Sequence, residues 1–346
     1  MIITQTPLRI SFLGGGTDYP EHFERHGGAV LGTAVDKSAY FNMSRFYSRM
    51  FDYSIRIAYR KVECVKTLDE LEHAPFRECL RWAGVTSDIE INHSAELPSF
   101  TGLGSSSAFV VGLLNTVYAF QRKLVPSLDL AYQAIDVERN VLGESVGVQD
   151  QTFAAVGGFN LIEFRGQNNF VVNRIPFTAD RLRDFEDHLL VLFTGIKRRA
   201  EDLAKAQVKR VDQNLDRLLR MRRAVDQGFD ILAGGKPLAR FGELLHESWM
   251  MKRGLDAGIS NSTIDDLYDA GMEAGALGGK LLGAGGGGFL LFFVPPEKRA
   301  AVQQRLSHLA EVDFQVNATG SHVVHCGNDR PIPSVTPRPR AVRGAA

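Results

Sequence analysis

Strand-like segments dominate the first half of the chain. Residues 1–13 alternate weakly between apolar and polar positions and are rich in β-branched side chains, which favours a strand. Similar runs predict further strands at 39–44, 54–59, 88–93, 156–164, 169–175 and 188–193. Apolar residues at helical spacing predict helices between these strands, at 68–82, 109–120 and 128–142.

Helical patterns dominate the second half, where residues 200–233, 238–251, 262–274 and 297–310 are predicted helices. A short apolar run, FLLFFV, predicts one strand at 289–294. The mixture indicates an α+β protein of two domains, which we place at 1–175 and 176–328. The tail at 329–346 contains four prolines and no apolar periodicity, so we expect it to be disordered.

Composition excludes several classes of protein. Lys plus Arg and Asp plus Glu number 40 each, so no net charge attracts the chain to nucleic acid or anionic membranes. The three cysteines are widely spaced, which argues against a disulfide framework or a structural zinc site and fits a reducing compartment. The first residues lack a signal-peptide pattern, and residues 289–294 are too few to span a bilayer. We therefore expect a cytoplasmic protein that binds neither nucleic acid nor membrane.

A loop rich in glycine and serine carries the strongest local signal for chemistry. It lies between a predicted strand and a predicted helix, and consists of Gly102, Leu103, Gly104, Ser105, Ser106, Ser107 and Ala108. Free backbone N–H groups and the helix dipole make such a helix start suitable for phosphate, and a serine there could also ligate magnesium. The alternative is a serine-capped helix after a tight turn. The loop lacks the lysine of a Walker A motif.

Two further glycine loops stand near the ends of the chain. Residues 283–288 match G-x-G-x-x-G, but they are expected between a helix and a following strand, which is the wrong context for a dinucleotide site. Five glycines in six residues indicate close approach to a ligand or to another backbone. Residues 14–18 read GGGTD, where Asp18 could accept hydrogen bonds from hydroxyl groups or form an Asx-turn.

Together the three loops resemble the three signature motifs of the GHMP kinases, which include galactokinase, homoserine kinase and mevalonate kinase. The matching segments are 7–14, 98–108 and 280–288, and the resemblance covers about residues 1–325. It implies an N-terminal domain like ribosomal protein S5 domain 2, a ferredoxin-like C-terminal domain and an active site between them.

The first loop narrows the resemblance. Galactokinases have Gly-Glu-His-Thr-Asp where this chain has GGGTD, so the Glu and His that serve galactose are missing. GGGTD is similar to the branch of D-glycero-D-manno-heptose 7-phosphate kinases and fucokinases, and so are residues 147–151, 246–253 and 275–280. A sugar phosphate acceptor is thus implied, with a free sugar such as fucose, an isoprenoid alcohol or a non-catalytic sensor of ATP and sugar as alternatives.

The resemblance also implies roles for single residues. ATP would lie on residues 102–107, and Ser107 and Glu138 would hold Mg²⁺. Asp150 would act as the catalytic base and Arg9 would orient it. The acceptor would bind at Gly15, Gly16, Thr17, Asp18, Gly285 and Gly286. The plainer alternatives are an exposed helix acid for Glu138, an N-cap for Asp150 and a surface ion pair for Arg9.

A phosphorylated acceptor needs a second anion site. Lys197 and Arg198, next to Arg199, follow the predicted strand at 188–193 and could form it, although a solvated basic helix start explains them equally well. Lys252, Arg253 and Lys280 are other candidates. The sequence indicates no macromolecular partner other than a second copy of the chain, since a homodimer stays possible.

Overall fold

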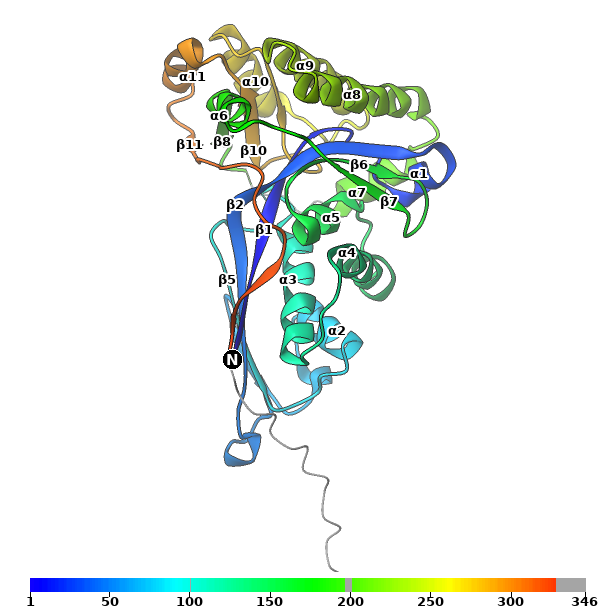
Figure 1. The fold of residues 1–346 in the computed structure, drawn as a ribbon, viewed down its shortest axis with the longest axis vertical. Coiled ribbons are helices and arrows are strands. Elements are labelled where there is room, and N and C mark those ends of the chain that lie inside the picture. Colours follow the sequence, from blue (N-terminus) through cyan, green and yellow to red (C-terminus); the bar gives the residue numbers. More distant parts are fainter. Residues whose placement is uncertain (100, 197–200, 328–346) are drawn as a thin grey trace, which may run out of the picture.

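A computed structural model describes residues 1–99, 101–196 and 201–327 of the chain (Figure 1). Its first layer is an eight-stranded sheet with the order β12-β1-β2-β5-β3-β4, extended by β6 on β2 and β7 on β6. The strands are β1 (Ile2–Leu13), β2 (Gly28–Arg45), β3 (Ile55–Ala58), β4 (Val62–Val65), β5 (Ile89–Ala95), β6 (Phe159–Phe164), β7 (Phe170–Arg174) and β12 (His322–Cys326). The strands predicted from period-two patterns in this half are confirmed.

Helices cover one face of this sheet, and α3 packs along β1 and β2 (Figure 1). The helices of this half are α1 (Pro20–His26), α2 (Ala74–Trp82), α3 (Ser105–Phe120), α4 (Ser127–Asp136) and α5 (Gln149–Val156), with 3-10 turns at η1 (Ser48–Met50) and η2 (Leu68–Glu70). The helix predicted at 128–142 changes type along its length: α4 ends at Asp136, and a π-helical turn, η3 (Val137–Val141), follows it directly. Such turns are rare and often mark functional sites.

The second layer is a four-stranded antiparallel sheet with the order β11-β8-β10-β9. Its strands are β8 (Leu189–Phe193), β9 (Gly278–Leu281), β10 (Phe289–Phe293) and β11 (Ala310–Glu311). The helices of this half are α6 (Ala179–Asp187), α7 (Glu201–Lys209), α8 (Leu215–Ala233), α9 (Ala239–Arg253), α10 (Ser262–Glu273) and α11 (Arg299–Arg305), with a 3-10 turn at η4 (Pro296–Lys298). In chain order the strands lie as fourth, first, third and second, so the predicted ferredoxin-like arrangement is confirmed.

Two strands of the second sheet were not predicted: β9, and the two-residue β11, which begins where the helix predicted at 297–310 was expected to end. Residues 278–281 read as part of a glycine loop, but they form β9 against α9. A Cβ atom on Gly278 would lie 2.0 Å from the Gly242 carbonyl oxygen, so only glycine lets this strand and this helix approach so closely. The glycine loop at 283–288 therefore joins two strands, and its predicted position after a helix is wrong.

The end of the described chain returns to the first sheet. Strand β12 pairs antiparallel with β1, with Val323 opposite Thr4 (Figure 1). Isolated bridges from Val316 to Val35 and from Thr319 to Gly157 precede it. The segment 176–328 therefore contributes one strand to the sheet built mainly by residues 1–175.

An aromatic cluster joins the two sheets. Phe12 of β1 stacks on Phe159 of β6 with ring centroids 5.4 Å apart, and it meets Phe185 and Phe241 edge to face at 5.4 and 5.7 Å. Phe293 of β10 closes the cluster against Phe185 and Phe241. All five rings are buried, so they fix the second sheet over the end of β1.

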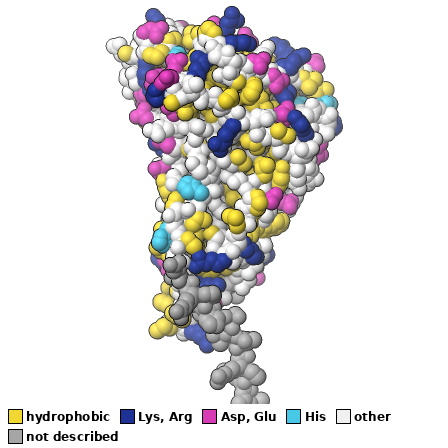
Figure 2. All heavy atoms as spheres, viewed as in Figure 1, with side chains coloured by type: hydrophobic (Ala, Val, Ile, Leu, Met, Phe, Trp, Pro, Cys, Tyr) yellow, Lys and Arg dark blue, Asp and Glu magenta, His cyan; other side chains and the backbone are white. Residues whose placement is uncertain are grey.

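The surface agrees with the balanced composition. On the face drawn in Figure 2, Lys and Arg side chains are interspersed with Asp and Glu rather than gathered by sign. Among the helices in the described ranges, none combines the length and the apolar character that crossing a bilayer requires.

Candidate active site

The glycine loops before α3 and between β9 and β10 touch backbone to backbone. A Cβ atom on Gly283 would lie 2.5 Å from the Gly102 Cα, and one on Gly288 would lie 2.4 Å from the Thr101 carbonyl oxygen. The Phe289 amide donates to that same carbonyl at 3.3 Å. The absence of side chains therefore lets the second sheet dock directly on the start of α3.

Gly285 and Gly286, predicted to bind substrate, lie against another part of the backbone. A Cβ atom on Gly285 would lie 2.7 Å from the Ile259 Cα, and the Gly286 amide donates to the Ile259 carbonyl at 2.9 Å. The sequence left two explanations for the glycines of the loop at 283–288, close approach to a ligand or to another backbone. The contacts of Gly285 and Gly286 with Ile259 support close approach to another backbone. Substrate contact by these two residues stays a prediction.

The start of α3 is built for an anion. Gly104 is its N-cap residue, with a left-handed φ of 74°, and Ser105, Ser106 and Ser107 form the first turn. The first N–H groups of a helix have no partner within the helix, and the dipole places partial positive charge there. Ser105 is half-buried, Ser106 is exposed and Ser107 is buried, so the turn presents both backbone and hydroxyl donors.

Asp150 lies directly beside this turn. The Arg9 side chain binds its carboxylate with two hydrogen bonds, Nε to Oδ1 at 2.9 Å and Nη2 to Oδ2 at 2.8 Å. Arg9 also donates from Nη1 to the Gly102 carbonyl at 2.7 Å. A Cβ atom on Gly104 would lie 3.2 Å from Asp150 Oδ2, so the loop, the arginine and the carboxylate form one cluster.

The other acidic candidate, Glu138, is buried in the π-helical turn η3. Its Oε2 accepts hydrogen bonds from the Ser107 hydroxyl at 3.0 Å and from the Gln151 amide. Its Oε1 is buried and has no hydrogen-bond partner among the described residues. Burial raises the pKa of Glu138 to about 8, and Glu144 and Asp150 add to this, while the hydrogen bonds from Gln151 and Ser107 oppose it.

An unpartnered carboxylate oxygen beside a serine hydroxyl suits a divalent cation. Magnesium prefers oxygen ligands and keeps several waters and phosphate oxygens, so it needs few from the protein. Within the described ranges, no three His, Cys, Asp or Glu side chains gather closely enough to hold a metal by themselves. The residues present therefore fit a cation that arrives with a nucleotide.

The GGGTD loop turns a buried carboxylate inward. Asp18 accepts hydrogen bonds from the Gly16 amide and from Gln149 Nε2, both at 2.9 Å. Burial raises its pKa, as does nearby Asp150, while the Gly16 and Gln149 hydrogen bonds oppose the rise. The Thr17 hydroxyl lies 2.8 Å from the carbonyls of Gly14 and Ala29, so it holds the loop together.

Among the basic candidates that the structure describes, Lys252 lies close to the acids of the site. It is buried on α9, and its amine donates to the Gly283 carbonyl. Burial lowers the pKa of Lys252 to about 8, as does Arg9, whereas Asp18 and Asp150 raise it. Lys252 thereby connects the third glycine loop to the acidic cluster.

The other basic candidates that the structure describes, Lys280 and Arg253, are bound to other groups, although Lys280 also lies close enough to Lys252, Arg9 and Asp18 for their charges to act on it. Lys280 donates to the backbone carbonyls of Ser11 at 2.7 Å and Phe12 at 2.8 Å, and Arg253 pairs with Asp265 at 2.9 Å. Lys280 and Arg253 thus have structural partners. Lys197 and Arg198 fall outside the described residues, and a role for them in binding a substrate phosphate stays a prediction.

Sequence reasoning missed the glutamines on either side of Asp150. Gln149 binds Asp18 and Gln151 binds Glu138, so one short segment at the start of α5 carries Asp150 and holds the other two acids of the site. Both side chains are buried. Their presence in a first helical turn, where exposed polar residues are usual, is the signal that could have drawn attention to them.

Two protein-family models match segments of this chain. The family model described as GHMP kinases N terminal domain matches residues 62–158. The model described as GHMP kinases C terminal matches residues 231–311. Together the two matches span about half of the chain, one mainly on each sheet.

Curated relatives include two sugar kinases. A D-glycero-alpha-D-manno-heptose 7-phosphate kinase of Campylobacter jejuni is 28% identical over 297 residues, covering 82% of this chain and 86% of that protein. An L-fucokinase/L-fucose-1-P guanylyltransferase of Bacteroides fragilis is 26% identical over 318 residues, covering 81% of this chain and 33% of that protein. The second match thus concerns one part of a longer enzyme.

Solved structures share the fold. A D-glycero-D-manno-heptose 1-phosphate kinase from Bacteroides thetaiotaomicron superposes with a TM-score of 0.78 at 22% identity, over 94% of this chain and 100% of that one. A Lactococcus lactis galactokinase complexed with galactose superposes with a TM-score of 0.71 at 19% identity, over 93% and 94%. At these identities the likeness establishes the fold alone.

Proposed function

The chain belongs to the GHMP kinase family, and from this premise we propose that it transfers the γ-phosphoryl group of ATP to a hydroxyl of a sugar phosphate. The acceptor we propose is D-glycero-D-manno-heptose 7-phosphate, which would become the 1,7-bisphosphate. One observation carries the proposal: the Arg9-bound carboxylate of Asp150 adjoins Gly104 at the anion-binding start of α3. The heptose is supported by the Campylobacter jejuni relative.

The start of α3 supplies the nucleotide side of the reaction. The backbone N–H groups of the first turn, together with the hydroxyls of Ser105 and Ser106, would donate to a bound polyphosphate. These donors are fixed by the fold before a nucleotide arrives, so they stabilise charge on the transferred group without rearranging. Catalysis of phosphoryl transfer depends mainly on such positioning and charge stabilisation.

Asp150 supplies the acceptor side. Its carboxylate takes the proton of the acceptor hydroxyl or holds that hydroxyl in line with the transferred group. An anomeric hydroxyl is more acidic than an ordinary alcohol, which makes a carboxylate an adequate base. Arg9 fixes both oxygens of Asp150 and places a positive charge beside the reacting atoms.

Glu138 and Ser107 are the residues that would hold Mg²⁺. The cation, when bound with ATP, neutralises charge on the phosphates. The buried Oε1 of Glu138, which has no hydrogen-bond partner among the residues that the structure describes, supports this assignment, because a cation would give that oxygen a partner. Gln151 keeps the carboxylate oriented through its other oxygen.

A coupled assay of ADP release tests the proposed function. With D-glycero-D-manno-heptose 7-phosphate as acceptor, we expect ADP and heptose bisphosphate in equal amounts. Release of ADP at the same rate without any acceptor would contradict the proposal and favour a sensor that hydrolyses ATP.

A free sugar is the second candidate acceptor, favoured by the Bacteroides fragilis relative, whose name includes L-fucokinase. The same assay with L-fucose and with unphosphorylated heptose separates the two candidates. If fucose reacts and the heptose phosphate does not, the sugar phosphate proposal is wrong while the kinase assignment stands.

A further inference from the structure

We propose that Arg139 is a positioning residue for the phosphoryl transfer described above. Its guanidinium joins segments of the chain that lead directly to the three acids of the site. The inference rests on the proposed function. It adds that the placement of these acids relative to one another depends on one arginine side chain.

Arg139 binds one carboxylate and one backbone carbonyl. It lies in η3, directly after Glu138. Its Nη2 pairs with Glu21 Oε1 at 2.5 Å, and its Nη1 donates to the Val146 carbonyl. The two neighbouring side chains of η3 thus have different partners, since Glu138 accepts a hydrogen bond from Ser107 at 3.0 Å.

The groups that Arg139 binds adjoin the other two acids. Glu21 lies in the first turn of α1, which begins shortly after Asp18. Val146 lies in the connection that leads from η3 into α5, where Asp150 stands in the first turn. Because Arg139 itself follows the third acid, its guanidinium links the backbone next to all three.

The connection between η3 and α5 has little regular structure of its own. Residues 143–147, all of them described by the structure, form neither helix nor strand. The far end of the connection is fixed to the GGGTD loop, because the Val148 amide donates to the Asp18 carbonyl at 3.0 Å. The hydrogen bond from Arg139 to Val146 therefore restrains the part of the connection that precedes this anchor.

The ion pair is sheltered enough to hold these segments in place. The side chain of Arg139 is 19% exposed and that of Glu21 is 36% exposed, so water and salt screen the pair less than a fully exposed one. A guanidinium is planar and binds several oxygens in a fixed geometry. Displacing a reacting group by about 1 Å can lower a rate by about 100-fold, so a looser connection should be felt at Asp150.

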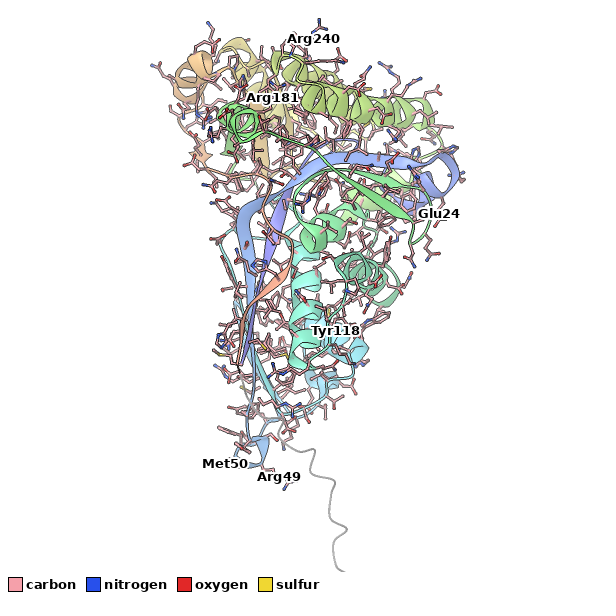
Figure 3. All side chains as sticks on the ribbon, viewed as in Figure 1. Glu24, Arg49, Met50, Tyr118, Arg181 and Arg240 are labelled. Carbon is pink, nitrogen blue, oxygen red and sulfur yellow. The ribbon has the colours of Figure 1, made fainter. Side chains whose placement is uncertain are left out.

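An open cavity of about 450 Å³ adjoins the ion pair. Arg139 and Glu21 both line it, and Figure 3 marks its place through Glu24, another lining residue. Neither Glu138 nor Asp150 is among the described residues that line it. A small cation can therefore reach the position of the Arg139 guanidinium without entering the active site.

Arg139→Met should lower kcat by about 10- to 100-fold, because Asp150 and Glu138 lose their fixed placement. The KM for ATP should change little, since the bonds of Arg139 go to α1 and the connection rather than to the loop at 102–107. Steady-state kinetics with the heptose phosphate measure both. A normal kcat, or a rise in the KM for ATP that matches the loss of kcat, would overturn the proposal.

Arg299→Met is the matched control, because Arg299 also binds one carboxylate and one backbone carbonyl. It donates to Glu311 at 2.8 Å and to the Leu189 carbonyl at 2.7 Å, and its side chain is 29% exposed. Its loss should lower the melting temperature about as much as the loss of Arg139 while kcat stays normal. An equal fall of kcat in both variants would make the effect one of general stability.

Glu21→Gln keeps the proposal testable if Arg139→Met fails to fold. It removes the charge of the partner and keeps its size, so kcat should fall in this variant as well. If the two residues act as a pair, the double variant should lose no more activity than Arg139→Met alone. Effects that multiply in the double variant would contradict a pair.

Hydrogen exchange tests the placement without any substrate. The amides of residues 143–148 should exchange faster in Arg139→Met than in Arg299→Met, because the connection loses its restraint. Unchanged exchange at these residues would overturn the proposal. Guanidinium chloride, too dilute to unfold the protein, should also restore part of kcat to Arg139→Ala through the adjoining cavity. The same recovery with sodium chloride, or none with guanidinium, would count against the guanidinium group.

Failure of the proposed function would look different. The unchanged enzyme would then phosphorylate neither heptose 7-phosphate nor a free sugar, whatever the exchange rates of the variants. Normal activity of Arg139→Met beside an active unchanged enzyme would refute the role of Arg139 alone.

Discussion

Asp150 is held firmly yet stays reachable. Its side chain is 24% exposed, while that of Arg9 is 6% exposed, so the arginine is locked in the interior and the carboxylate faces the loop before α3. Two parallel hydrogen bonds from a guanidinium fix the plane of a carboxylate. This geometry suits a group that must meet an incoming oxygen at a fixed place.

Asp150→Asn should leave the fold intact and lower kcat by roughly 10²–10⁴-fold, because an amide cannot take the acceptor proton. Single-turnover phosphoryl transfer measures the effect. Asp226→Asn is the matched control, since Asp226 pairs with Arg222 on the surface of α8. Near-normal activity of Asp150→Asn would contradict the role of base.

Glu138 should make stability depend on pH. Its folded pKa of about 8 lies above the ordinary value of 4.5, so the folded state retains a proton that the unfolded state has lost. The free energy of unfolding should therefore fall as pH rises from about 4.5 to about 8, by about 1.4 kcal/mol per unit of pKa difference at most. The side chain of Glu138→Gln is always neutral, so the free energy of unfolding of this variant should lack that part of the pH dependence.

Urea unfolding at pH 5.5 and pH 8, without divalent cations, measures the contribution of Glu138. The difference between the unchanged protein and Glu138→Gln cancels the titration of other groups. Parallel pH profiles for the two proteins would show that Glu138 ionises normally. Mg²⁺ with ATP should restore stability at pH 8 in the unchanged protein and not in Glu138→Gln.

At the scale of elements, the start of α3 depends on a backbone conformation that only glycine adopts easily. Gly104 has a φ of 74°, and its missing side chain leaves room for Arg9 and Asp150. The turn η3 plays a complementary part, because it directs Glu138 at Ser107 in the same first helical turn. The two elements together define where a nucleotide and its cation can sit.

Gly104→Ala should therefore lower kcat/KM strongly while lowering the melting temperature only moderately. The left-handed conformation should cost roughly 1–2 kcal/mol, and the added carbon would press on Asp150 Oδ2 at 3.2 Å. Gly84→Ala is the matched control, since Gly84 has a φ of 71° with nothing within 4 Å. We expect similar melting temperatures for the two variants, with a large loss of kcat/KM for Gly104→Ala alone; equal activity would argue against the cluster.

At the scale of the whole molecule, the site exists only where the two sheets meet. The long axis separates Met50, in the 3-10 turn η1 that follows β2, from Arg240 at the start of α9, as Figure 3 shows. Between these ends, the aromatic cluster around Phe12 and the contacts of the 102 and 283 loops hold the sheets together. Lys252 and Asp150 come from opposite sides of this junction. They lie close enough there for the charge of Asp150 to act on Lys252.

Gly283→Ala should disturb this junction. The added carbon would lie 2.5 Å from the Gly102 Cα, so one loop must move away from the other and the sheets must shift. Gly235→Ala, with a φ of 67° and open space around it, carries the same backbone strain without the clash. Calorimetry should show a clearly lower melting temperature for Gly283→Ala than for Gly235→Ala. Equal melting temperatures would show that the loops yield freely.

The sequence by itself determined the local features of this protein. Period-two patterns predicted most strands of the first sheet, although not β4 or β12, helical spacing predicted most helices, and runs of glycine marked the three loops, because each signal acts within a few residues. The resemblance of those loops to a family then supplied the fold and the roles assigned to Asp150, Arg9 and Glu138. The strand β9 escaped this reasoning, since its glycines serve contact with α9 rather than a turn.

Only the tertiary structure decided which groups meet. Arg9 and Asp150 are 141 residues apart in the chain, and Lys280 lies 269 residues from the carbonyl of Ser11 that it binds. No local propensity encodes such pairs, because they depend on how whole elements pack. Ser11, Gln149 and Lys252 come from three segments that are far apart in the sequence, and their convergence on Gly15 follows from the docking of α9 and α5 against the end of β1.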